Sequence, residues 1–267
     1  MRTYCLVSGG LDSYLTWWIT KAKPIFINYN QQYIQKELET VKKLYEDLTI
    51  IEIKDLPTNK NRYIPCRNLM FCTIVSHFDC DKILISGMDD DKDIDKSPKE
   101  FGKMSRMISK HANRQITIES PWWGYSKSSA VKKYLELGGN PEDLTKTYSC
   151  YKPEKCYECD ACYRWGIALL SNKINVKPPS INNIINRGIK QLWHRPIERL
   201  NEICSAMDFT SIKYKIINEN YDEINRDFLN GSIVIVNVKC KIGDCTSIAQ
   251  ELRNKGYLFH GIVPFGK

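Results

Sequence analysis

Residues 8–13 read Ser8-Gly9-Gly10-Leu11-Asp12-Ser13 and lie between two apolar segments. The run at residues 4–7 predicts a strand, and residues 14–19 predict the first turns of a helix. Two adjacent glycines let the backbone pass close to a phosphate, and the N–H groups at a helix N-terminus favour an anion. The stretch therefore predicts an anion-binding loop. The alternative is a plain serine–glycine turn with a helix cap.

The polar side chains of this stretch indicate which phosphate chemistry it supports. Ser8 and Ser13 can donate hydroxyl groups to a phosphate. The stretch lacks the lysine of a Walker-type loop, which argues against transfer of a γ-phosphate. Asp12 would repel a polyphosphate without a metal ion between them, so we expect Mg²⁺ to accompany the nucleotide.

The hexapeptide resembles the pyrophosphate loop, or PP loop, of the N-type ATP pyrophosphatases. These enzymes cleave ATP between the α- and β-phosphates to adenylate a carbonyl oxygen. The resemblance implies that ATP is bound by Ser8, Gly9, Gly10, Leu11, Asp12 and Ser13. Several reactions share this loop, so the resemblance implies the activation step only.

Length and composition set the outer limits of the prediction. The 267 residues, 42% of them hydrophobic, suffice for one sizeable core with a smaller appended lobe. The net charge of +8 suits phosphate-bearing ligands or nucleic acid. A strand expected close to the first residue leaves no room for a signal peptide, and no apolar run approaches the roughly 20 residues that span a membrane. We expect a cytoplasmic protein, in which the eleven cysteines favour a metal site over disulfides.

Short apolar runs alternate with longer amphipathic segments over residues 1–149. This alternation predicts an α/β fold, a doubly wound parallel sheet with helices on both faces, and the resemblance implies the adenine nucleotide alpha hydrolase-like version. Ligands of such sheets bind at the carboxyl ends of the strands, where Ser8, Tyr29 and Gly87 are expected. The strands are expected at 4–7, 24–29, 49–53, 82–86 and 115–119, and the helices after the PP loop at 34–48, 69–78 and 98–111.

Two segments resemble one branch of the superfamily, the 7-cyano-7-deazaguanine synthases. Tyr29 and Gln31, followed by Glu37, match a Tyr-x-Gln…Glu segment, and Arg67-Asn68 matches a Pro-x-Arg-Asn segment. The resemblance implies that Tyr29, Gln31, Arg67 and Asn68 bind the substrate. An arginine and an asparagine at a helix start also suit a phosphate or a planar base. Alternatively, Asn68 only caps the helix, Arg67 is a surface charge and Glu37 lies on a solvated helix face.

The segment at residues 87–101 departs from that family. The family carries an aspartate, a Gly-Tyr-Pro-Asp-Cys-Arg-like run and a phenylalanine, of which this chain matches Gly87, Asp93 and Glu100-Phe101 over a shorter loop. The resemblance implies that Gly87 and Asp93 bind the substrate. The five aspartates of the segment could equally form a solvated acidic turn. This departure leaves the acceptor of the activation step open.

Residues 119–127 resemble the passage of the family from a strand through proline into a Ser-Lys helix start. The resemblance implies that Lys127 faces the polyphosphate and that Lys127 and Asp12 are the catalytic residues. The alternative for Lys127 is an ordinary solvent-facing lysine.

Four cysteines follow with the spacing C-x5-C-x2-C-x2-C: Cys150, Cys156, Cys159 and Cys162. Four thiolates satisfy one tetrahedral Zn²⁺ with no open position, which predicts a structural zinc site. The alternatives are an iron–sulfur cluster or unrelated buried thiols. The arrangement resembles the Ser-Cys-Tyr…Cys-x-x-Cys-x-x-Cys-x-x-Arg signature of the 7-cyano-7-deazaguanine synthases, with Arg164 near its end and a shorter gap after the first cysteine. The resemblance covers residues 1–171.

The remaining residues predict a small α+β lobe of unknown role. A linker-like break at 171–180 contains two prolines. Helices are expected at 181–193, 197–207 and 246–255, and strands at 232–240 and 257–263. We expect three parts: the PP-loop ATP pyrophosphatase domain at 1–149, the four-cysteine zinc-binding module at 150–171 and the lobe at 181–267. Cys204, Cys240 and Cys245 are interpreted as ordinary thiols.

The resemblance implies an ATP-dependent, C–N bond-forming ligase of amidotransferase type. It would convert 7-carboxy-7-deazaguanine and ammonia to 7-cyano-7-deazaguanine through an adenylate and an amide. The altered loop and the extra lobe motivate a second hypothesis, a changed acceptor. That enzyme would be a deazaguanine amide synthase, a defence enzyme that joins a deazapurine to a macromolecule, or a tRNA thiolase using Cys66 or Cys72. A third hypothesis, a non-catalytic nucleic-acid binder, leaves residues 8–13 unexplained.

The expected small-molecule partners are ATP with Mg²⁺, ammonia and a 7-deazaguanine base, and no membrane is expected among the partners. The sequence leaves open whether the chain forms a homodimer and whether it binds nucleic acid directly. It also leaves open whether the product serves queuosine in tRNA, DNA modification or defence.

Overall fold

The computed structural model describes residues 2–31, 33–54, 56, 64–89, 91, 95–191, 195–218 and 221–264. The chain divides into two compact units, Met1–Lys155 and Cys156–Lys267. Among the described residues, none of the helices combines the length and the apolar character that crossing a membrane requires. The three-part division expected from the sequence stays a prediction.

The first unit contains a parallel sheet of five strands in the order β3-β2-β1-β4-β5. The chain runs outward from β1 in one direction and then returns to the other side of it, so the strand order reverses at β1. In open α/β sheets such a reversal creates a ligand-binding crevice at the carboxyl ends of the strands. The strands are β1 (Thr3–Leu6), β2 (Lys23–Asn28), β3 (Thr49–Glu52), β4 (Lys82–Leu84) and β5 (Thr117–Glu119).

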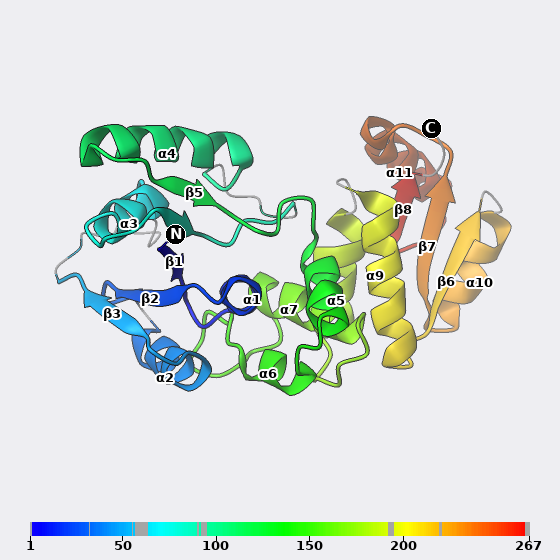
Figure 1. The fold of residues 1–267 in the computed structure, drawn as a ribbon. Coiled ribbons are helices and arrows are strands. Elements are labelled where there is room, and N and C mark those ends of the chain that lie inside the picture. The colour runs from blue at the N-terminus through cyan, green and yellow to red at the C-terminus, as the bar shows by residue number, and fades with distance from the viewer. Residues whose placement is uncertain are drawn as a thin grey trace. The chain divides into compact units, whose positions relative to one another are not determined.

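Helices cover both faces of this sheet, as the alternating sequence pattern predicts. Figure 1 shows α3 and α4 on one face, with α1 and α2 on the other. The strand β2 is apolar without alternation, and its Ile25, Phe26 and Ile27 are all buried, because both faces of the sheet are covered. The helices are α1 (Leu11–Thr20), α2 (Ile34–Leu44), α3 (Arg67–Val75), α4 (Pro98–Ala112), α5 (Lys127–Glu136) and α6 (Pro141–Lys146).

The observed α3 begins two residues before the helix expected at 69–78 and ends earlier, at Val75. This start places Arg67 and Asn68 in the first helical turn. Its N-cap is Cys66, whose φ of 56° lies in the left-handed region. The chain therefore turns sharply just before the two residues that the resemblance assigns to the substrate.

The second unit contains a parallel three-stranded sheet in the order β6-β7-β8. Its strands alternate with helices, an arrangement that the expected α+β lobe did not specify. The expected strands at 232–240 and 257–263 correspond to β7 and β8, whereas β6 and α10 were not predicted. The elements are α7 (Asp160–Leu170), α8 (Ile181–Asn183), η1 (Ile184–Gly188), η2 (Ile189–Gln191), α9 (Pro196–Phe209), β6 (Tyr214–Asn218), η3 (Tyr221–Glu223), α10 (Ile224–Leu229), β7 (Ile233–Val238), η4 (Ile242–Asp244), α11 (Cys245–Asn254) and β8 (Gly261–Pro264).

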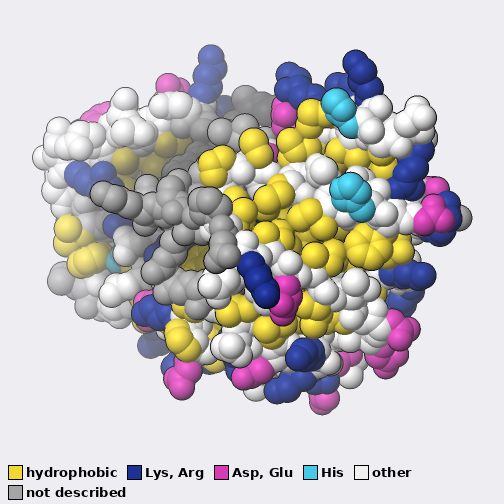
Figure 2. Space-filling view, turned by 90° about the vertical axis from the view of Figure 1, so that its left-hand side faces the viewer, with side chains coloured by type: hydrophobic (Ala, Val, Ile, Leu, Met, Phe, Trp, Pro, Cys, Tyr) yellow, Lys and Arg dark blue, Asp and Glu magenta, His cyan; other side chains and the backbone are white. Residues whose placement is uncertain are grey.

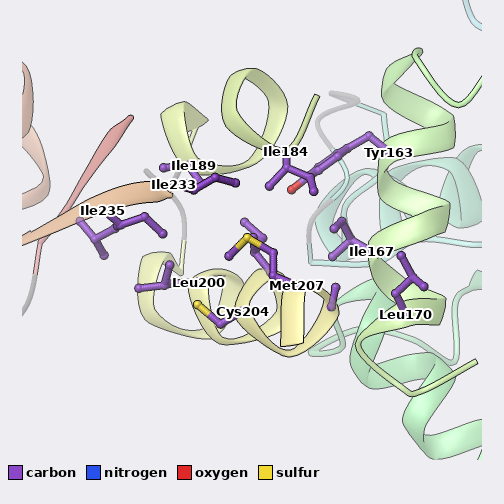
Figure 3. Packing of buried hydrophobic residues seen from close by; sticks show 13 residues of the cluster. Tyr163, Ile167, Leu170, Ile184, Ile189, Leu200, Cys204, Met207, Ile233 and Ile235 are labelled. Atoms are coloured by element: carbon purple, nitrogen blue, oxygen red, sulfur yellow. The ribbon is translucent and has the colours of Figure 1, made fainter. Parts of the chain in front are cut away.

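The helix α7, which carries the last of the four clustered cysteines, belongs to the core of the second unit. Its Tyr163, Ile167 and Leu170 join one buried cluster with Met207 of α9 and Ile235 of β7, and Figure 3 shows Tyr163 and Ile167 extending from α7 toward the side of Met207. Alternate residues of β7 join a separate cluster on the opposite face of the sheet. The helix that contains Cys162 therefore packs in the same core as the C-terminal helices and strands.

The remaining cysteines of this unit form a close pair. Cys240 and Cys245 flank the turn η4, and their Sγ atoms lie 3.7 Å apart. Cys204 is buried in the core on α9. Within the part of the chain that the structure describes, neither the pair nor Cys204 belongs to a group of three or more metal-type ligands.

Candidate active site and metal centre

Residues 8–13, called the PP loop below after the segment that they resemble, connect β1 to α1, as their sequence predicts. Gly9 has a φ of +70°, and a Cβ atom there would lie 3.0 Å from Thr40 Cγ2. Both the backbone conformation and the space therefore require glycine at this position. Gly10 is the N-cap of α1 with ordinary extended backbone angles.

Ser13 holds the PP loop in shape. Its hydroxyl donates to the Gly10 carbonyl at 3.0 Å and accepts from the Ser8 N–H at 3.2 Å. Its Oγ also lies 3.3 Å from the hydroxyl of buried Tyr45. Ser13 is buried, whereas Ser8 is exposed, so Ser8 is the better placed of the two serines to reach a ligand.

Asp12 and Lys127 come together beside the PP loop. Asp12 lies in the first turn of α1, and Lys127 is the first residue of α5. Their carboxylate and ammonium groups form an ion pair, and only 10% of the Lys127 side chain is exposed. Lys127 is thus not an ordinary solvent-facing lysine. The two residues predicted to be catalytic share one location at the carboxyl end of β1.

A second group of polar side chains follows β2. The Tyr29 N–H donates to Gln31 Oε1 at 3.0 Å, and the Gln31 amide donates to the Glu37 carboxylate. Burial raises the pKa of Glu37, while the Gln31 amide and the Arg67 guanidinium act in the opposite direction. Burial also raises the pKa of Tyr29, which Arg67 again opposes. Glu37 therefore belongs to a polar cluster with Tyr29, Gln31 and Arg67 and does not lie on a solvated face.

Asn68 connects this region to the 87–101 segment. Its side chain is buried and donates to Asp95 Oδ2 at 2.8 Å, so it does not act as the cap of α3. Asp93, which the resemblance assigns to the substrate, lies outside the described residues. Sequence reasoning missed Asp95, because nothing in the run of aspartates indicates which one faces α3.

The described aspartates earlier in this segment bind their own surroundings. Asp89 accepts from the Gly124 N–H at 2.9 Å, and Asp91 accepts from the Met88 N–H at 3.1 Å. The Asp91 side chain is 6% exposed and lies 3.5 Å from Lys96 Nζ. Asp91 is therefore enclosed by the protein, whereas Asp89 is exposed and accepts a backbone hydrogen bond at the surface.

Gly87 lies where β4 and β5 lead toward the site. Its N–H donates to Ser120 Oγ at 3.0 Å, and the Ser120 hydroxyl donates to the Gly87 carbonyl at 2.7 Å. A Cβ at Gly87 would lie 2.3 Å from the Trp123 ring. The Trp123 ring in turn meets Phe101 edge-on, with centroids 5.1 Å apart. Gly87 is therefore needed for close packing of Trp123, an aromatic residue that sequence reasoning did not assign to the site.

Residues 147–150 pass over the PP loop, and we refer to them as the strap. The Tyr148 N–H donates to the Gly9 carbonyl at 2.8 Å. The Leu11 N–H, at the start of α1, donates to Ser149 Oγ at 3.5 Å. Sequence reasoning grouped these residues with the cysteine signature and missed their contact with the PP loop, which joins positions 138 residues apart.

The strap leads directly into the four cysteines. Their Sγ atoms all lie within 4.8 Å of one another, and those of Cys156 and Cys162 are 3.9 Å apart. A tetrahedral Zn²⁺ with Zn–S bonds of about 2.3 Å needs sulfur atoms about 3.8 Å apart. Within the described ranges this is the single group of three or more such ligands. The donor set and its spacing therefore fit a tetrahedral metal ion.

Backbone N–H groups support negative charge on these sulfur atoms. The Cys159 N–H donates to Cys156 Sγ at 3.3 Å, and the Cys162 N–H donates to Cys159 Sγ at 3.4 Å. Tyr157, between the first two of these cysteines, has a φ of 57°, which turns the chain back toward Cys156. Donors of this kind stabilise thiolates, the form that binds a metal.

A separate hollow of about 670 Å³ lies between the end of α3 and the end of α4. Figure 2 shows two histidines and hydrophobic side chains together on one face of the molecule. The hollow lies beside the amino ends of β4 and β5, opposite the PP loop, and contains none of the predicted site residues. It is lined by Leu69, Thr73, Ser76, His77, Phe78, Asp79, Met107, Ile108, His111, Ala112 and Arg114.

Comparison with known proteins connects this geometry to a family. The family model for Queuosine biosynthesis protein QueC matches residues 51–172. Several curated 7-cyano-7-deazaguanine synthases are also similar to the chain. That of Methanococcus maripaludis strain C6 is 24% identical over 61% of this chain and 92% of its own length. That of Campylobacter hominis is 28% identical over 61% of this chain and 91% of its own length.

Over residues 51–172 the chain is similar to the QueC family. The synthase of Persephonella marina is similar as well, with 29% identity over 59% of this chain and 87% of its own length. A solved structure described as a predicted subunit of tRNA methyltransferase from Methanocaldococcus jannaschii has a TM-score of 0.35 and 18% identity, covering 58% of this chain and 93% of that one.

The range that matches the QueC model contains Arg67, Asn68, Lys127 and the four cysteines, and it begins after the PP loop. The parallel α/β sheet and the four-cysteine group agree with the fold class expected from the sequence. The relatives are matched over almost their whole length by about three fifths of this chain. The chain therefore has a large part that these relatives lack.

Two further cysteines differ in their capacity to act as nucleophiles. Cys72 is fully buried, and burial raises the pKa of its thiol well above the ordinary value. Cys66 is exposed and precedes Arg67 in the polar region. Since the thiolate is the reactive form, Cys72 is unsuited to the thiolase role and Cys66 alone of the two can be tested for it.

Proposed function

We propose that this QueC-like chain uses ATP to convert 7-carboxy-7-deazaguanine and ammonia to 7-cyano-7-deazaguanine. The names shared by its relatives and the strand–loop–helix form of the PP loop support this reaction. The observation that carries it is the meeting of Asp12 and Lys127 beside the PP loop. A carboxylate and an ammonium at one loop suit a magnesium-bound polyphosphate.

The chemistry explains why these groups suffice. A carboxylate is a poor electrophile until one of its oxygens becomes part of a leaving group. Attack of that oxygen on the α-phosphorus of ATP releases pyrophosphate, and ammonia then displaces AMP to form the amide. The amide oxygen then attacks the α-phosphorus of a second ATP and releases pyrophosphate, and loss of AMP and the two amide protons yields the nitrile. This sequence needs charge stabilisation and positioning, and it needs no nucleophile from the protein.

The residues of the PP loop have distinct proposed roles. The backbone of Gly9, Gly10 and Leu11 binds the phosphates at the start of α1, and the exposed Ser8 hydroxyl donates to them. Asp12 holds the Mg²⁺ that accompanies ATP. Lys127 stabilises the negative charge that develops on the departing pyrophosphate.

The polar cluster after β2 is the proposed site of the deazapurine base. Tyr29, Gln31 and Arg67 converge there with Glu37, and Asn68 lies in the same turn of α3 as Arg67. Amide and guanidinium groups match the donors and acceptors at the edge of a guanine-like ring. Gly87, packed on Trp123, and Asp93 complete the proposed set.

The four cysteines are proposed to hold one structural Zn²⁺. When bound, the metal supplies no reactive position, because four thiolates complete its tetrahedron, and it stabilises the local fold. We expect one zinc per chain by elemental analysis of the purified protein. Iron with visible absorbance, or soluble active protein without metal, would contradict this assignment.

The 87–101 segment favours one alternative, a changed acceptor. Its described aspartates are held by the protein itself, and the chain extends beyond its relatives. A deazaguanine amide synthase or an enzyme that joins a deazapurine to a macromolecule would keep the same activation step. A thiolase would require Cys66, so unchanged turnover of the Cys66→Ala variant would remove that version.

Mass spectrometry of the small molecules formed from ATP, Mg²⁺, ammonia and 7-carboxy-7-deazaguanine tests the proposal. The nitrile, the amide and the unreacted acid differ in mass. We expect the nitrile together with AMP and pyrophosphate. Accumulation of the amide alone would favour the amide synthase, and unreacted acid with intact ATP would reject both the proposed reaction and the amide synthase.

A further inference from the structure

The strap places one hydroxyl group directly at the start of α1. A Cβ added to Gly10 would lie 3.4 Å from Ser149 Oγ and 3.5 Å from Ser8 Oγ. The two serine hydroxyls therefore flank the glycine that caps α1. Gly10 itself has no side chain with which to cap the helix, and Ser149 Oγ already accepts from the Leu11 N–H.

This position gives the Ser149 hydroxyl a specific capacity. A serine oxygen that accepts a hydrogen bond still has its own proton to donate. The N-terminal end of α1 is where the proposed function places the phosphates of ATP. A hydroxyl there can donate to a phosphate oxygen in the same way as Ser8, although it comes from a distant part of the chain.

The strap is fixed on both sides of Ser149. Thr147 is fully buried, and its hydroxyl donates to the Leu144 carbonyl of α6 at 2.6 Å. Tyr148 is buried, and its hydroxyl donates to the carbonyl of Lys152. The residue after Ser149 is Cys150, a member of the thiol group that fits a metal ion. The position of the hydroxyl thus depends on a side chain that the metal would hold.

We propose that Ser149 binds a phosphate oxygen of the nucleotide and that metal bound through Cys150 holds Ser149 in place. This inference rests on the proposed function, because it assumes that the PP loop binds ATP. It makes the metal centre a positioning element for the nucleotide site as well as a structural one. By linkage, metal raises the affinity for the nucleotide, and the nucleotide raises the affinity for metal by the same factor.

The first test compares serine variants in the full-length, zinc-loaded protein. The probe is α,β-methylene ATP with Mg²⁺, titrated calorimetrically because it is not cleaved at the bond in question. Ser149→Ala should weaken its binding by about tenfold, the usual worth of a hydrogen bond to a charged group. Ser149→Thr keeps the hydroxyl and should bind nearly as well as the wild type. Ser171→Ala, at the end of α7, is the matched control and should have no effect.

The second test measures the linkage from the metal side. Zinc affinity is determined at free zinc concentrations fixed by a chelator buffer, with and without saturating α,β-methylene ATP. The nucleotide should tighten zinc binding in the wild type, and the effect should shrink in Ser149→Ala. Zinc content and thermal midpoint are recorded for every variant, so that loss of fold is recognised.

The outcomes separate this inference from the proposed function. If the wild type binds the analogue and Ser149→Ala binds it equally well, the role of Ser149 is overturned while the proposed function stands. If zinc affinity is the same with and without nucleotide, the linkage is overturned. If the wild type does not bind the analogue at all, both the inference and the proposed function fail.

Discussion

The PP loop and the 87–101 segment follow the neighbouring strands β1 and β4, yet they are held in different ways. In the PP loop, Ser13 bonds Gly10 and Ser8, three and five residues away. In the 87–101 segment, Asp95 bonds Asn68 and Asp89 bonds Gly124, 27 and 35 residues away. The PP loop also receives distant contacts, from Tyr45, Lys127 and the strap, but the hydrogen bonds that shape its turn are local, and a turn shaped by its own residues can be recognised as a short motif. A loop held by distant residues cannot be recognised in this way, because its own sequence contains only one of the two residues in each contact.

The largest expected effect concerns the charge pair at the PP loop. Asp12→Asn keeps the size of the side chain but removes its charge, and we expect formation of AMP and pyrophosphate to fall at least about 10²–10³-fold, by analogy with other lost electrostatic groups. The measurement is AMP release in the presence of 7-carboxy-7-deazaguanine and ammonia. Activity within about threefold of the wild type would contradict the role of Asp12.

The same pair makes a stability control possible. The Asp12 side chain is 24% exposed and pairs with the Lys127 ammonium, whose side chain is 10% exposed. Removing Asp12 alone leaves Lys127 buried without that carboxylate, which lowers the free energy of unfolding. The double variant Asp12→Asn, Lys127→Met should recover much of this stability but no activity.

The second expected effect concerns the backbone of the PP loop. The Gly9→Ala substitution adds a Cβ to a residue in a left-handed conformation and places it against Thr40. We expect this change to lower the free energy of unfolding by about 2–3 kcal/mol. Gly138 is the matched control, since its φ is +85° but nothing lies within 4 Å of an added Cβ. Gly138→Ala should cost about 1 kcal/mol. Equal urea midpoints for the two variants would mean that Thr40 does not restrict Gly9.

A smaller effect is expected in the 87–101 segment. Asp95→Ala removes the partner of the Asn68 amide, so we expect the KM for 7-carboxy-7-deazaguanine to rise about five- to tenfold, as for one lost hydrogen bond, with little change in the KM for ATP. Asp93→Ala should act in the same direction if Asp93 contacts the base. Steady-state kinetics with each substrate varied in turn distinguish the cases. An equal rise in both KM values would remove the segment from base recognition.

The smallest expected effect is a pH dependence of stability. Burial raises the pKa of Glu37 in the folded protein above its ordinary value. The folded state therefore holds more protons than the unfolded state between the two pKa values, and stability from this group is present below the unfolded pKa and lost as pH rises through the folded one. In the Glu37→Gln variant the urea midpoint should change less with pH between the two pKa values. An unchanged slope would show that Glu37 is not buried in the polar cluster.

The same difference between local and distant contacts explains which features of the protein the sequence predicts. The parallel sheet was predictable because apolar runs such as Ile25-Phe26-Ile27 and the amphipathic segments between them have clear periods. The four cysteines were predictable because their ligand spacing is local. Asp95 and Ser149 were not, since each contact joins residues far apart in the sequence.

The second unit shows a further limit. Strand β7 is a long apolar run and was expected, whereas β6 is shorter, with only two consecutive isoleucines at Ile216 and Ile217. Its residues become a strand because they pair in parallel with β7 along their whole length. A strand that is stabilised mainly by pairing with a neighbouring strand cannot be predicted from its own residues alone.

Exchange of labelled pyrophosphate into ATP is the measurement that tests the central claim most directly. The claim is that the PP loop with Asp12 and Lys127 adenylates the carboxylate of 7-carboxy-7-deazaguanine. With ammonia left out, labelled pyrophosphate attacks the bound adenylate and re-forms ATP and the acid, so we predict exchange that requires the acid and is lost in Asp12→Asn. No exchange with the wild type, or exchange that does not depend on 7-carboxy-7-deazaguanine, would contradict the claim.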